Sequence, residues 1–455
     1  MKKDLGKDSI LQLVFSLAIP AMIAQLVNVL YSIVDRMFVG QIPEIGNQAL
    51  AAVGVCGPIV TLLSSFGTLI GIGGSIFMSI KMGQKKMDDA KQILYTSFIM
   101  LVCVSIILTI LFLFLRKPMI YWFGGSDVLY PYANTYLTIY TAGTFFALMA
   151  IGMNYFITCQ GFASIAMFSV IIGAITNIVL DAIFIRVLHM QIAGAAVATV
   201  IAQIMSSLFV IGFLISKYSH VQLKKNIFQT DFAKTILKLG FSPFIIIASD
   251  SIIIILMNTI LQKAGGSGYG DVLISAATIA QSCFLLITGP LLGITSGTQT
   301  IISYNFGAKN RKRIEKAFKT IITLALCFCT FMFIIIMFFS ASFVSMFTND
   351  PTTTPIAIKA IRIFILGIIP MAIQYALVDG ITALSNVKIS LALSMTRKTI
   401  YIFSLIMLPI LFAAESIFFA QPIADILATT ITSIVFIKTF PDFMRNNGMQ
   451  EIQTS

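Results

Sequence analysis

Charge is scarce in this chain of 455 residues, of which only 11% are charged whereas 58% are hydrophobic. Soluble chains are about a quarter charged and a little under half apolar. A soluble domain could not bury such an excess of apolar surface, but a lipid bilayer accommodates it. The composition therefore indicates an integral membrane protein.

Residues and motifs that carry enzyme chemistry are also rare. The sequence has two histidines, His189 and His220, and both lie near the ends of apolar runs. Neither a His-Glu-x-x-His zinc motif nor a P-loop is present. The six cysteines lie in or beside apolar runs and are interpreted as small buried hydrophobes. We therefore expect a protein that is not an enzyme, with no cofactor and no nucleotide.

Apolar stretches long enough to cross a bilayer recur along the whole chain, since a spanning helix needs roughly 20 mostly apolar residues. Short alternating strands of a β-barrel are not visible. The stretches predict about twelve spans, at residues 10–40, 48–80, 92–115, 128–158, 164–187, 193–216, 235–262, 272–304, 317–344, 356–384, 388–412 and 415–438.

The net charge of +12 gathers in alternate loops, which argues for membrane topology rather than for nucleic acid as a partner. Positive residues stay on the cytoplasmic side of membrane proteins. We therefore expect a multi-pass protein of the cell membrane with both termini cytoplasmic and lipids as its surroundings. The basic loops contain Lys2, Lys3 and Lys7; Lys81, Lys85, Lys86 and Lys91; Lys217, Lys224, Lys225, Lys234 and Lys238; and Lys309, Arg311, Lys312, Arg313, Lys316 and Lys319.

The two halves of the chain resemble each other. Pro20 in the first span matches Pro243 in the seventh, and Gly73 to Gly83 match Gly297 to Gly307 at the same spacing. Each half holds six predicted spans, so both halves begin on the same side of the membrane and form parallel repeats. Transporters use such halves as two bodies that rock about a central cavity. The predicted lobes are residues 1–222 and 223–455.

Five short motifs follow one another in the order and spacing of a known transporter family. They are Val34-Asp35-Arg36-Met37-Phe38-Val39-Gly40, Ala49-Leu50-Ala51-Ala52-Val53-Gly54, Gly194-Ala195-Ala196-Val197-Ala198-Thr199, Ile302-Ser303-Tyr304-Asn305-Phe306-Gly307-Ala308 and Gln421-Pro422-Ile423-Ala424-Asp425. On these motifs the chain resembles the multidrug and toxic compound extrusion (MATE) family over essentially its whole length.

The resemblance implies an all-α membrane transporter with two six-helix lobes in a V shape, which we expect to act as a monomer. It further implies antiport, in which small lipophilic or cationic organic compounds leave the cell in exchange for inward H⁺ or Na⁺. A flippase or exporter of a lipid-linked or amphipathic metabolite, with the same architecture, is the alternative.

Ionisable groups at membrane depth are costly, so each is a functional candidate. Topology places Asp35, Asp181 and Thr199 in one layer beneath the outer surface, and Asn177 lies one helical turn before Asp181. Two carboxylates, an amide and a hydroxyl supply hard oxygen ligands for Na⁺, or a pair that shares a proton. The family resemblance implies the same four residues as the coupling-cation site. Arg36, beside Asp35, is expected to extend to the interface instead.

The second half lacks this carboxylate pair. The repeat alignment places Asn258 opposite Asp35 and Leu405 near the counterpart of Asp181. Other polar side chains within the spans are candidates for the substrate cavity or, for the two carboxylates among them, for a second cation site or a pair with Arg397 or Lys398. These tentative cavity residues are Gln25, Asn154, Asp250, Gln281 and Asp379.

Overall fold

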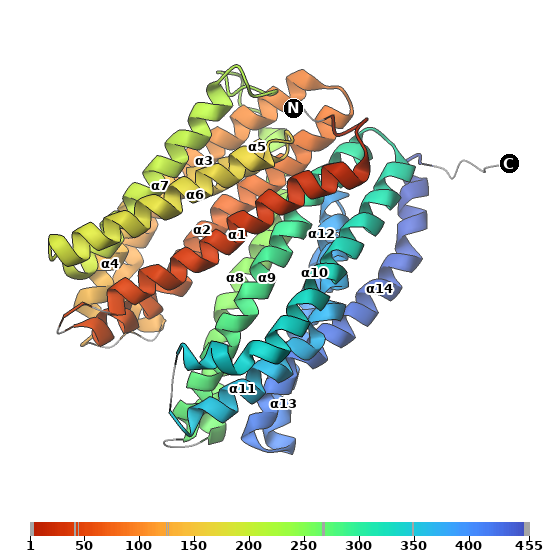
Figure 1. The fold of residues 1–455 in the computed structure, drawn as a ribbon. Coiled ribbons are helices and arrows are strands. Elements are labelled where there is room, and N and C mark those ends of the chain that lie inside the picture. The colour runs from red at the N-terminus through yellow and green to blue at the C-terminus, as the bar shows by residue number, and fades with distance from the viewer. Residues whose placement is uncertain are drawn as a thin grey trace. The chain divides into compact units, whose positions relative to one another are not determined.

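The computed structural model describes residues 4–40, 42–43, 45–123, 125, 127–265, 269–347 and 350–449 (Figure 1). This part of the chain is helical and contains no strand. The α-helices are α1 (Ile10–Gly40), α2 (Gly46–Gly83), α3 (Met87–Trp122), α4 (Tyr130–Ala142), α5 (Thr144–Thr158), α6 (Ala163–Asp181), α7 (Gln191–Ile215), α8 (Thr230–Gly265), α9 (Tyr269–Gly307), α10 (Arg311–Ser345), α11 (Thr353–Phe364), α12 (Ile368–Ala383), α13 (Val387–Leu411) and α14 (Ala420–Asn446).

The helices confirm the predicted number of spans. Among the described residues, 11 helices are long and apolar enough to cross a membrane, and the bent pair of α4 and α5 raises the number to 12. Large apolar side chains such as Phe114, Phe338 and Ile437 are more than two-thirds exposed, as expected of surfaces that face lipid. The protein is therefore a multi-pass membrane protein.

Several predicted spans are interrupted rather than continuous. Span 128–158 bends by 57° at Gly143, between α4 and α5. A 3₁₀ turn at Ile365–Gly367 separates α11 from α12, and another at Ala414–Phe419 precedes α14. A π-helical segment, η1 (Ala182–Val187), follows α6 directly. Breaks of this kind do not lower hydropathy, so a hydropathy pattern does not reveal them.

The chain forms two compact units that differ in extent from the predicted lobes. Unit 1 holds Ile23–Ala248 and the start of the chain to Gly6, and unit 2 holds Lys7–Met22 and the chain from Ser249 onward. The predicted boundary at 222/223 precedes α8, whereas the contacts divide the chain inside α8. The first parts of α1 and α8 therefore pack with helices of the other half of the sequence.

Close backbone contact explains this exchange of helix segments. In unit 1, a Cβ atom at Gly240 of α8 would lie 1.8 Å from the carbonyl oxygen of Leu69 in α2. In unit 2, a Cβ atom at Gly293 of α9 would lie 2.6 Å from the carbonyl oxygen of Ala21 in α1. Only a residue without a side chain allows helices to approach this closely.

Candidate functional site

Unit 1 brings together the four residues predicted to bind the coupling cation. Asp35 lies on α1, Asn177 and Asp181 on α6, and Thr199 on α7, and all four side chains are buried. The carboxyl groups of Asp35 and Asp181 are within hydrogen-bonding reach of each other. Asn177 Nδ2 donates a hydrogen bond to Thr199 Oγ1 at 3.3 Å. Three helices thus converge on one buried polar cluster, which we call the carboxyl-pair cluster.

Several oxygen atoms of this cluster accept no hydrogen bond from a described donor. Within the described part of the chain, Asp35 Oδ1, Asn177 Oδ1 and both carboxyl oxygens of Asp181 are buried and accept no hydrogen bond. Neither Asp35 nor Asp181 forms a salt bridge with a described basic residue, and the neighbouring Arg36 is exposed. Buried polar atoms are normally satisfied. Acceptors that face one another in this way favour a proton or a small cation between them.

Tyrosines and a glutamine surround the carboxyl pair, and sequence reasoning missed them. Tyr31 is half-buried, lies close to both Asp35 and Asp181, and precedes Asp35 by one helical turn on α1. Gln203 follows Thr199 by one turn on α7, and its Nε2 donates to Tyr140 Oη at 3.1 Å. The spacing of four residues from a predicted site residue is the signal that could have found Tyr31 and Gln203.

The carboxyl pair is also linked to an irregular segment. Asp181 is the last residue of α6, and η1 begins at the next residue. Arg186 of η1 lies over the ring of Phe38 of α1, with 4.9 Å between its guanidinium carbon and the ring centroid. Phe38 follows Asp35 by one turn on the same helix. Since π-helical turns are frequent at functional sites, the irregular backbone here agrees with the location of the cluster.

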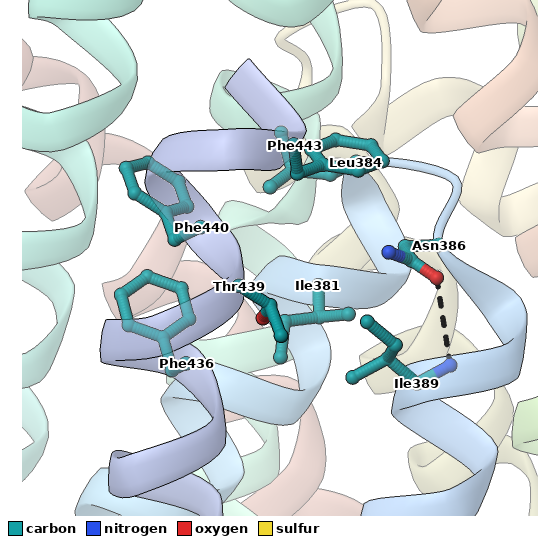
Figure 2. A pocket seen from close by; sticks show the side chains of 8 residues that line it. All are labelled: Ile381, Leu384, Asn386, Ile389, Phe436, Thr439, Phe440 and Phe443. Atoms are coloured by element: carbon teal, nitrogen blue, oxygen red, sulfur yellow. Dashed lines mark hydrogen bonds between the residues drawn. The ribbon is translucent and has the colours of Figure 1, made fainter. Parts of the chain in front are cut away.

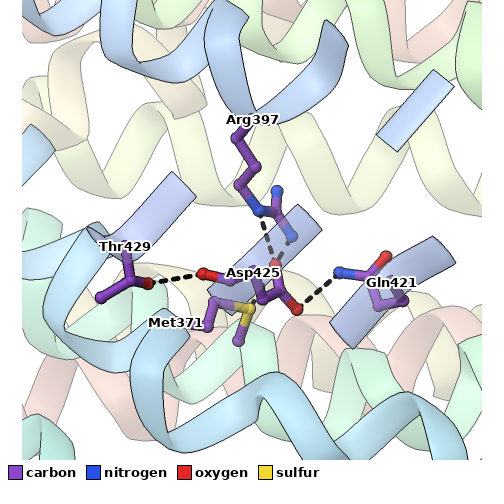
Figure 3. Close-up of polar contacts among 5 residues, drawn as sticks. All are labelled: Met371, Arg397, Gln421, Asp425 and Thr429. Carbon is purple, nitrogen blue, oxygen red and sulfur yellow. Dashed lines mark hydrogen bonds and ion pairs between the residues drawn. The ribbon is translucent and has the colours of Figure 1, made fainter. Parts of the chain in front are cut away.

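In unit 2, by contrast, the buried carboxylate of Asp425 has a basic partner. Asp425 of α14 is completely buried, and Arg397 Nε of α13 donates to its Oδ1 at 2.7 Å (Figure 3). Gln421 Nε2 donates to the second oxygen, Oδ2, at 2.9 Å. Figure 3 shows Met371 of α12 beside the guanidinium, which also lies over the ring of Tyr375. Both carboxyl oxygens of Asp425 therefore have hydrogen-bond partners, as expected of a structural residue.

The two candidate carboxylates of unit 2, Asp250 and Asp379, have contrasting partners. Lys398 Nζ, next to Arg397 on α13, lies 2.7 Å from Asp250 Oδ1 of α8. Asp379 of α12 accepts hydrogen bonds from Thr295 and Gln299 of α9, while its Oδ2 is buried and has no partner among the described residues. Arg397 and Lys398 thus pair with Asp425 and Asp250. The side chain of Asn258, the repeat counterpart of Asp35, lies outside the described ones.

Comparison with known proteins identifies the family. The sequence model of the MatE family matches residues 20–183 and 246–402, which together exceed half of the chain. The chain belongs to the MatE family. This confirms the resemblance to multidrug and toxic compound extrusion transporters that the sequence motifs indicate.

Relatives of this MatE protein cover nearly its whole length. Multidrug export protein MepA of Staphylococcus haemolyticus (strain JCSC1435) is 23% identical over 454 residues, covering 97% of this chain and 95% of that protein. MepA of Staphylococcus aureus (strain MSSA476) is 21% identical over 435 residues, with 94% of each chain covered.

Solved structures of MATE transporters share the fold of this MatE protein. One is an outward-facing multidrug resistance transporter of the MOP superfamily, with a TM-score of 0.91 at 22% identity, covering 97% of this chain and 98% of that chain. The structure of a MOP superfamily transporter from Pyrococcus furiosus is also similar, with a TM-score of 0.90 at 22% identity, covering 96% of this chain and 98% of that chain.

The remaining tentative cavity residues of this MatE protein lie in both units, Gln25 and Asn154 in unit 1 and Gln281 in unit 2. Asn154 Nδ2 of α5 donates to Ala166 O at 3.0 Å and to Ser169 Oγ at 2.5 Å, so it ties α5 to α6. Gln281 Nε2 of α9 donates to Met257 Sδ of α8 at 3.3 Å. Gln25 is half-buried on α1. The hydrogen bonds of Asn154 and Gln281 join helices within each unit, and their role in substrate binding stays a prediction.

A small hollow lies at the ends of α12, α13 and α14 in unit 2 (Figure 2). Its walls are mainly apolar, and Asn386 Oδ1 is already used, because it accepts a hydrogen bond from Ile389 N at 3.5 Å at the start of α13. The hollow offers little polar chemistry for a charged substrate or ion. Its lining residues are Ile381, Leu384, Asn386, Ile389, Phe436, Thr439, Phe440 and Phe443.

Proposed function

We propose that this MatE protein is a secondary antiporter that exports small lipophilic or cationic organic compounds in exchange for inward H⁺ or Na⁺. The proposal includes a location in the cell membrane, with both termini cytoplasmic and a monomer as the functional unit. Multidrug export is the activity named for the MepA relatives, which match this chain from end to end.

The carboxyl-pair cluster is the observation that carries the coupling. Asp35 and Asp181 face each other while buried, and neither forms a salt bridge with a described residue. Two ionised carboxylates this close repel strongly where water is scarce. A shared proton relieves the repulsion, and so does a Na⁺ ion held by the two carboxylates with Asn177 and Thr199 as further oxygen ligands. The cluster is therefore well suited to load a coupling cation.

Coupled export requires that binding of the cation and binding of the substrate weaken each other. In the proposed cycle, the carboxyl-pair cluster takes up H⁺ or Na⁺ from outside the cell, and the bound cation weakens the affinity for substrate. Linkage then requires that bound substrate weakens the affinity for the cation by the same factor. The irregular segment η1, which begins directly after Asp181, is the element best placed to respond to the charge state of the pair.

Export of a lipid-linked anion receives less support. Such a substrate needs free basic side chains within the membrane-spanning part. The two basic residues in the middle of α13, Arg397 and Lys398, instead pair with Asp425 and Asp250. We therefore favour cationic and neutral lipophilic compounds over anionic lipids.

Efflux from vesicles tests this function. Purified protein is reconstituted, and export of ethidium, a fluorescent organic cation, is followed under an imposed pH gradient, an imposed sodium gradient or neither. We expect the wild type to pump with one of the two gradients. Under that gradient, Asp35→Asn and Asp181→Asn should each lower the efflux rate at least about tenfold. Asp350→Asn, which changes an exposed carboxylate in unit 2, is the matched control. Equal pumping by Asp35→Asn and wild type would refute the site assignment.

A further inference from the structure

The two basic residues in the middle of α13 form ion pairs of opposite character. Arg397 and Lys398 are adjacent, so their side chains leave the helix about 100° apart. Arg397 reaches Asp425 on α14, and Lys398 reaches Asp250 on α8. The first pair joins neighbouring helices in the interior of unit 2, whereas the second contains a carboxylate that remains accessible.

The Arg397–Asp425 pair is closed to any ligand. The side chain of Asp425 is 0% exposed, and its two oxygens bind Arg397 and Gln421 respectively. A second cation could reach this carboxylate only by breaking a buried, hydrogen-bonded pair, which is strongly unfavourable. This pair therefore holds α13 against α14.

The Lys398–Asp250 pair is open on the carboxylate side. The Lys398 side chain is 8% exposed, but that of Asp250 is 57% exposed. Asp250 lies about 20 residues from the start of α8 and therefore roughly 30 Å along the helix. A charged group that is exposed at such a position faces a water-accessible space, because contact with lipid is too costly. Asp250 can thus be reached by a ligand while Lys398 remains behind it.

We propose that Asp250 binds the positive group of an organic cation, and that Lys398 is a tethered counter-ion with which this cation competes. Lys398 is therefore a specificity-determining residue, and this inference rests on the proposed export of organic compounds. With no substrate present, Lys398 neutralises Asp250, so the carboxylate needs no ion from solution. When substrate leaves, Lys398 regains its partner, which favours release.

The chemistry of the pair selects an organic cation over a bare metal ion. A metal ion needs several oxygen ligands around it, but the ligand sphere of Asp250 is shared with a repelling ammonium. An organic cation spreads its charge over a larger group, and one carboxylate with apolar surroundings suffices to bind it. Unit 2 then recognises substrate at Asp250, while unit 1 carries the coupling cation.

Equilibrium binding of ethidium to the purified full-length protein tests the inference without an ion gradient. We expect Lys398→Met to bind ethidium about tenfold more tightly than wild type, because the competing charge is gone. Asp250→Asn should bind about tenfold more weakly. Combined with Asp250→Asn, the Lys398→Met change should tighten binding by clearly less than about tenfold, because no carboxylate remains for which Lys398 and ethidium compete.

Three controls make the result decisive. Lys388→Met removes an exposed positive charge from the same helix and should leave affinity unchanged. Lys398→Gln removes the charge but keeps a hydrogen-bond donor, and it should tighten ethidium binding as Lys398→Met does. With two variants, the test remains possible if one of them fails to fold. Nile red, a neutral apolar dye, should bind wild type and Lys398→Met equally.

The outcomes separate this inference from the proposed antiport. Unchanged or weaker ethidium binding in both Lys398 variants would overturn the role of Lys398, even if the wild type pumps on an ion gradient. The expected binding pattern in a protein that pumps on no gradient would overturn the antiport and leave the role of Lys398 supported. An equal effect of Lys398→Met with and without Asp250→Asn would also overturn the inference.

Discussion

The carboxylates within the spans of the two units differ in their partners. In unit 1, Asp35 and Asp181 face each other, and neither forms a salt bridge within the described part of the chain. In unit 2, Asp425 and Asp250 each meet a basic residue of α13 at 2.7 Å. These internal partners neutralise Asp425 and Asp250 without ions from solution, whereas Asp379 forms no salt bridge with a described residue. The carboxyl-pair cluster in unit 1 has a negative charge that a cation from solution can neutralise, which supports a division of labour between the units.

Breaking the closed pair of unit 2 should have the largest effect on stability. Arg397→Met leaves the buried carboxylate of Asp425 without its cation, and removal of one partner of a buried pair costs about 3–5 kcal/mol. Thermal unfolding of the purified protein measures the loss. The double variant Arg397→Met/Asp425→Leu should recover much of it, because no uncompensated charge remains. If the single variant unfolds at the wild-type temperature, the pair is not structural.

The same chemical change in unit 1 should affect transport instead of stability. Asp181→Asn removes one of two facing acceptors that have no basic partner, so we expect unfolding to change by less than about 1 kcal/mol. Gradient-driven ethidium efflux should fall at least about tenfold. Asp425→Asn is the matched variant in unit 2 and should lose clearly more stability. Equal losses in the two variants would contradict the contrast between the units.

The close helix contact in unit 1 gives a smaller expected effect. Gly240→Ala places a Cβ atom 1.8 Å from the carbonyl oxygen of Leu69, so α8 must move away from α2. Overpacking of this kind costs about 1–3 kcal/mol. Gly212→Ala on α7 is the matched control, since nothing lies within 4 Å of its added Cβ. Thermal unfolding should show a loss for Gly240→Ala and none for Gly212→Ala; identical curves would remove this contact as the reason for the unit boundary.

The smallest effect is expected at an exposed carboxylate of unit 2. Hydrogen bonds from Thr352 and Thr353, including the Thr353 N–H at 2.8 Å, lower the pKa of Asp350 to about 2. A carboxyl group whose pKa is lowered on folding stabilises the protein above its unfolded pKa of about 3.9, and this stabilisation is lost as the pH falls toward 2. Asp350→Ala should therefore lower the unfolding temperature slightly at pH 7 and by less at pH 4. A difference that grows on acidification would contradict this assignment.

The sequence by itself determined the membrane class, about twelve spans and the identity of the four residues in the carboxyl-pair cluster. Apolar length is a local property, and an inside-to-outside count of residues places Asp35, Asp181 and Thr199 at one depth. Tyr31 and Gln203 lie one turn from these residues, yet their inclusion depends on how the helices face one another. The spacing of four residues makes both of them candidates, whereas only the packing of the helices shows what they contact.

Only the tertiary structure decided which charges meet. Arg397 and Lys398 are neighbours in sequence, and depth alone allowed either of them to pair with Asp250 or Asp379. The rotation of α13 against α8 and α14 sends Arg397 to Asp425 and Lys398 to Asp250. The backbone contact at Gly240, which divides α8 between the units, is equally non-local. Hydropathy and depth are set along the chain, whereas helix rotation and close approach arise from packing between segments far apart in sequence.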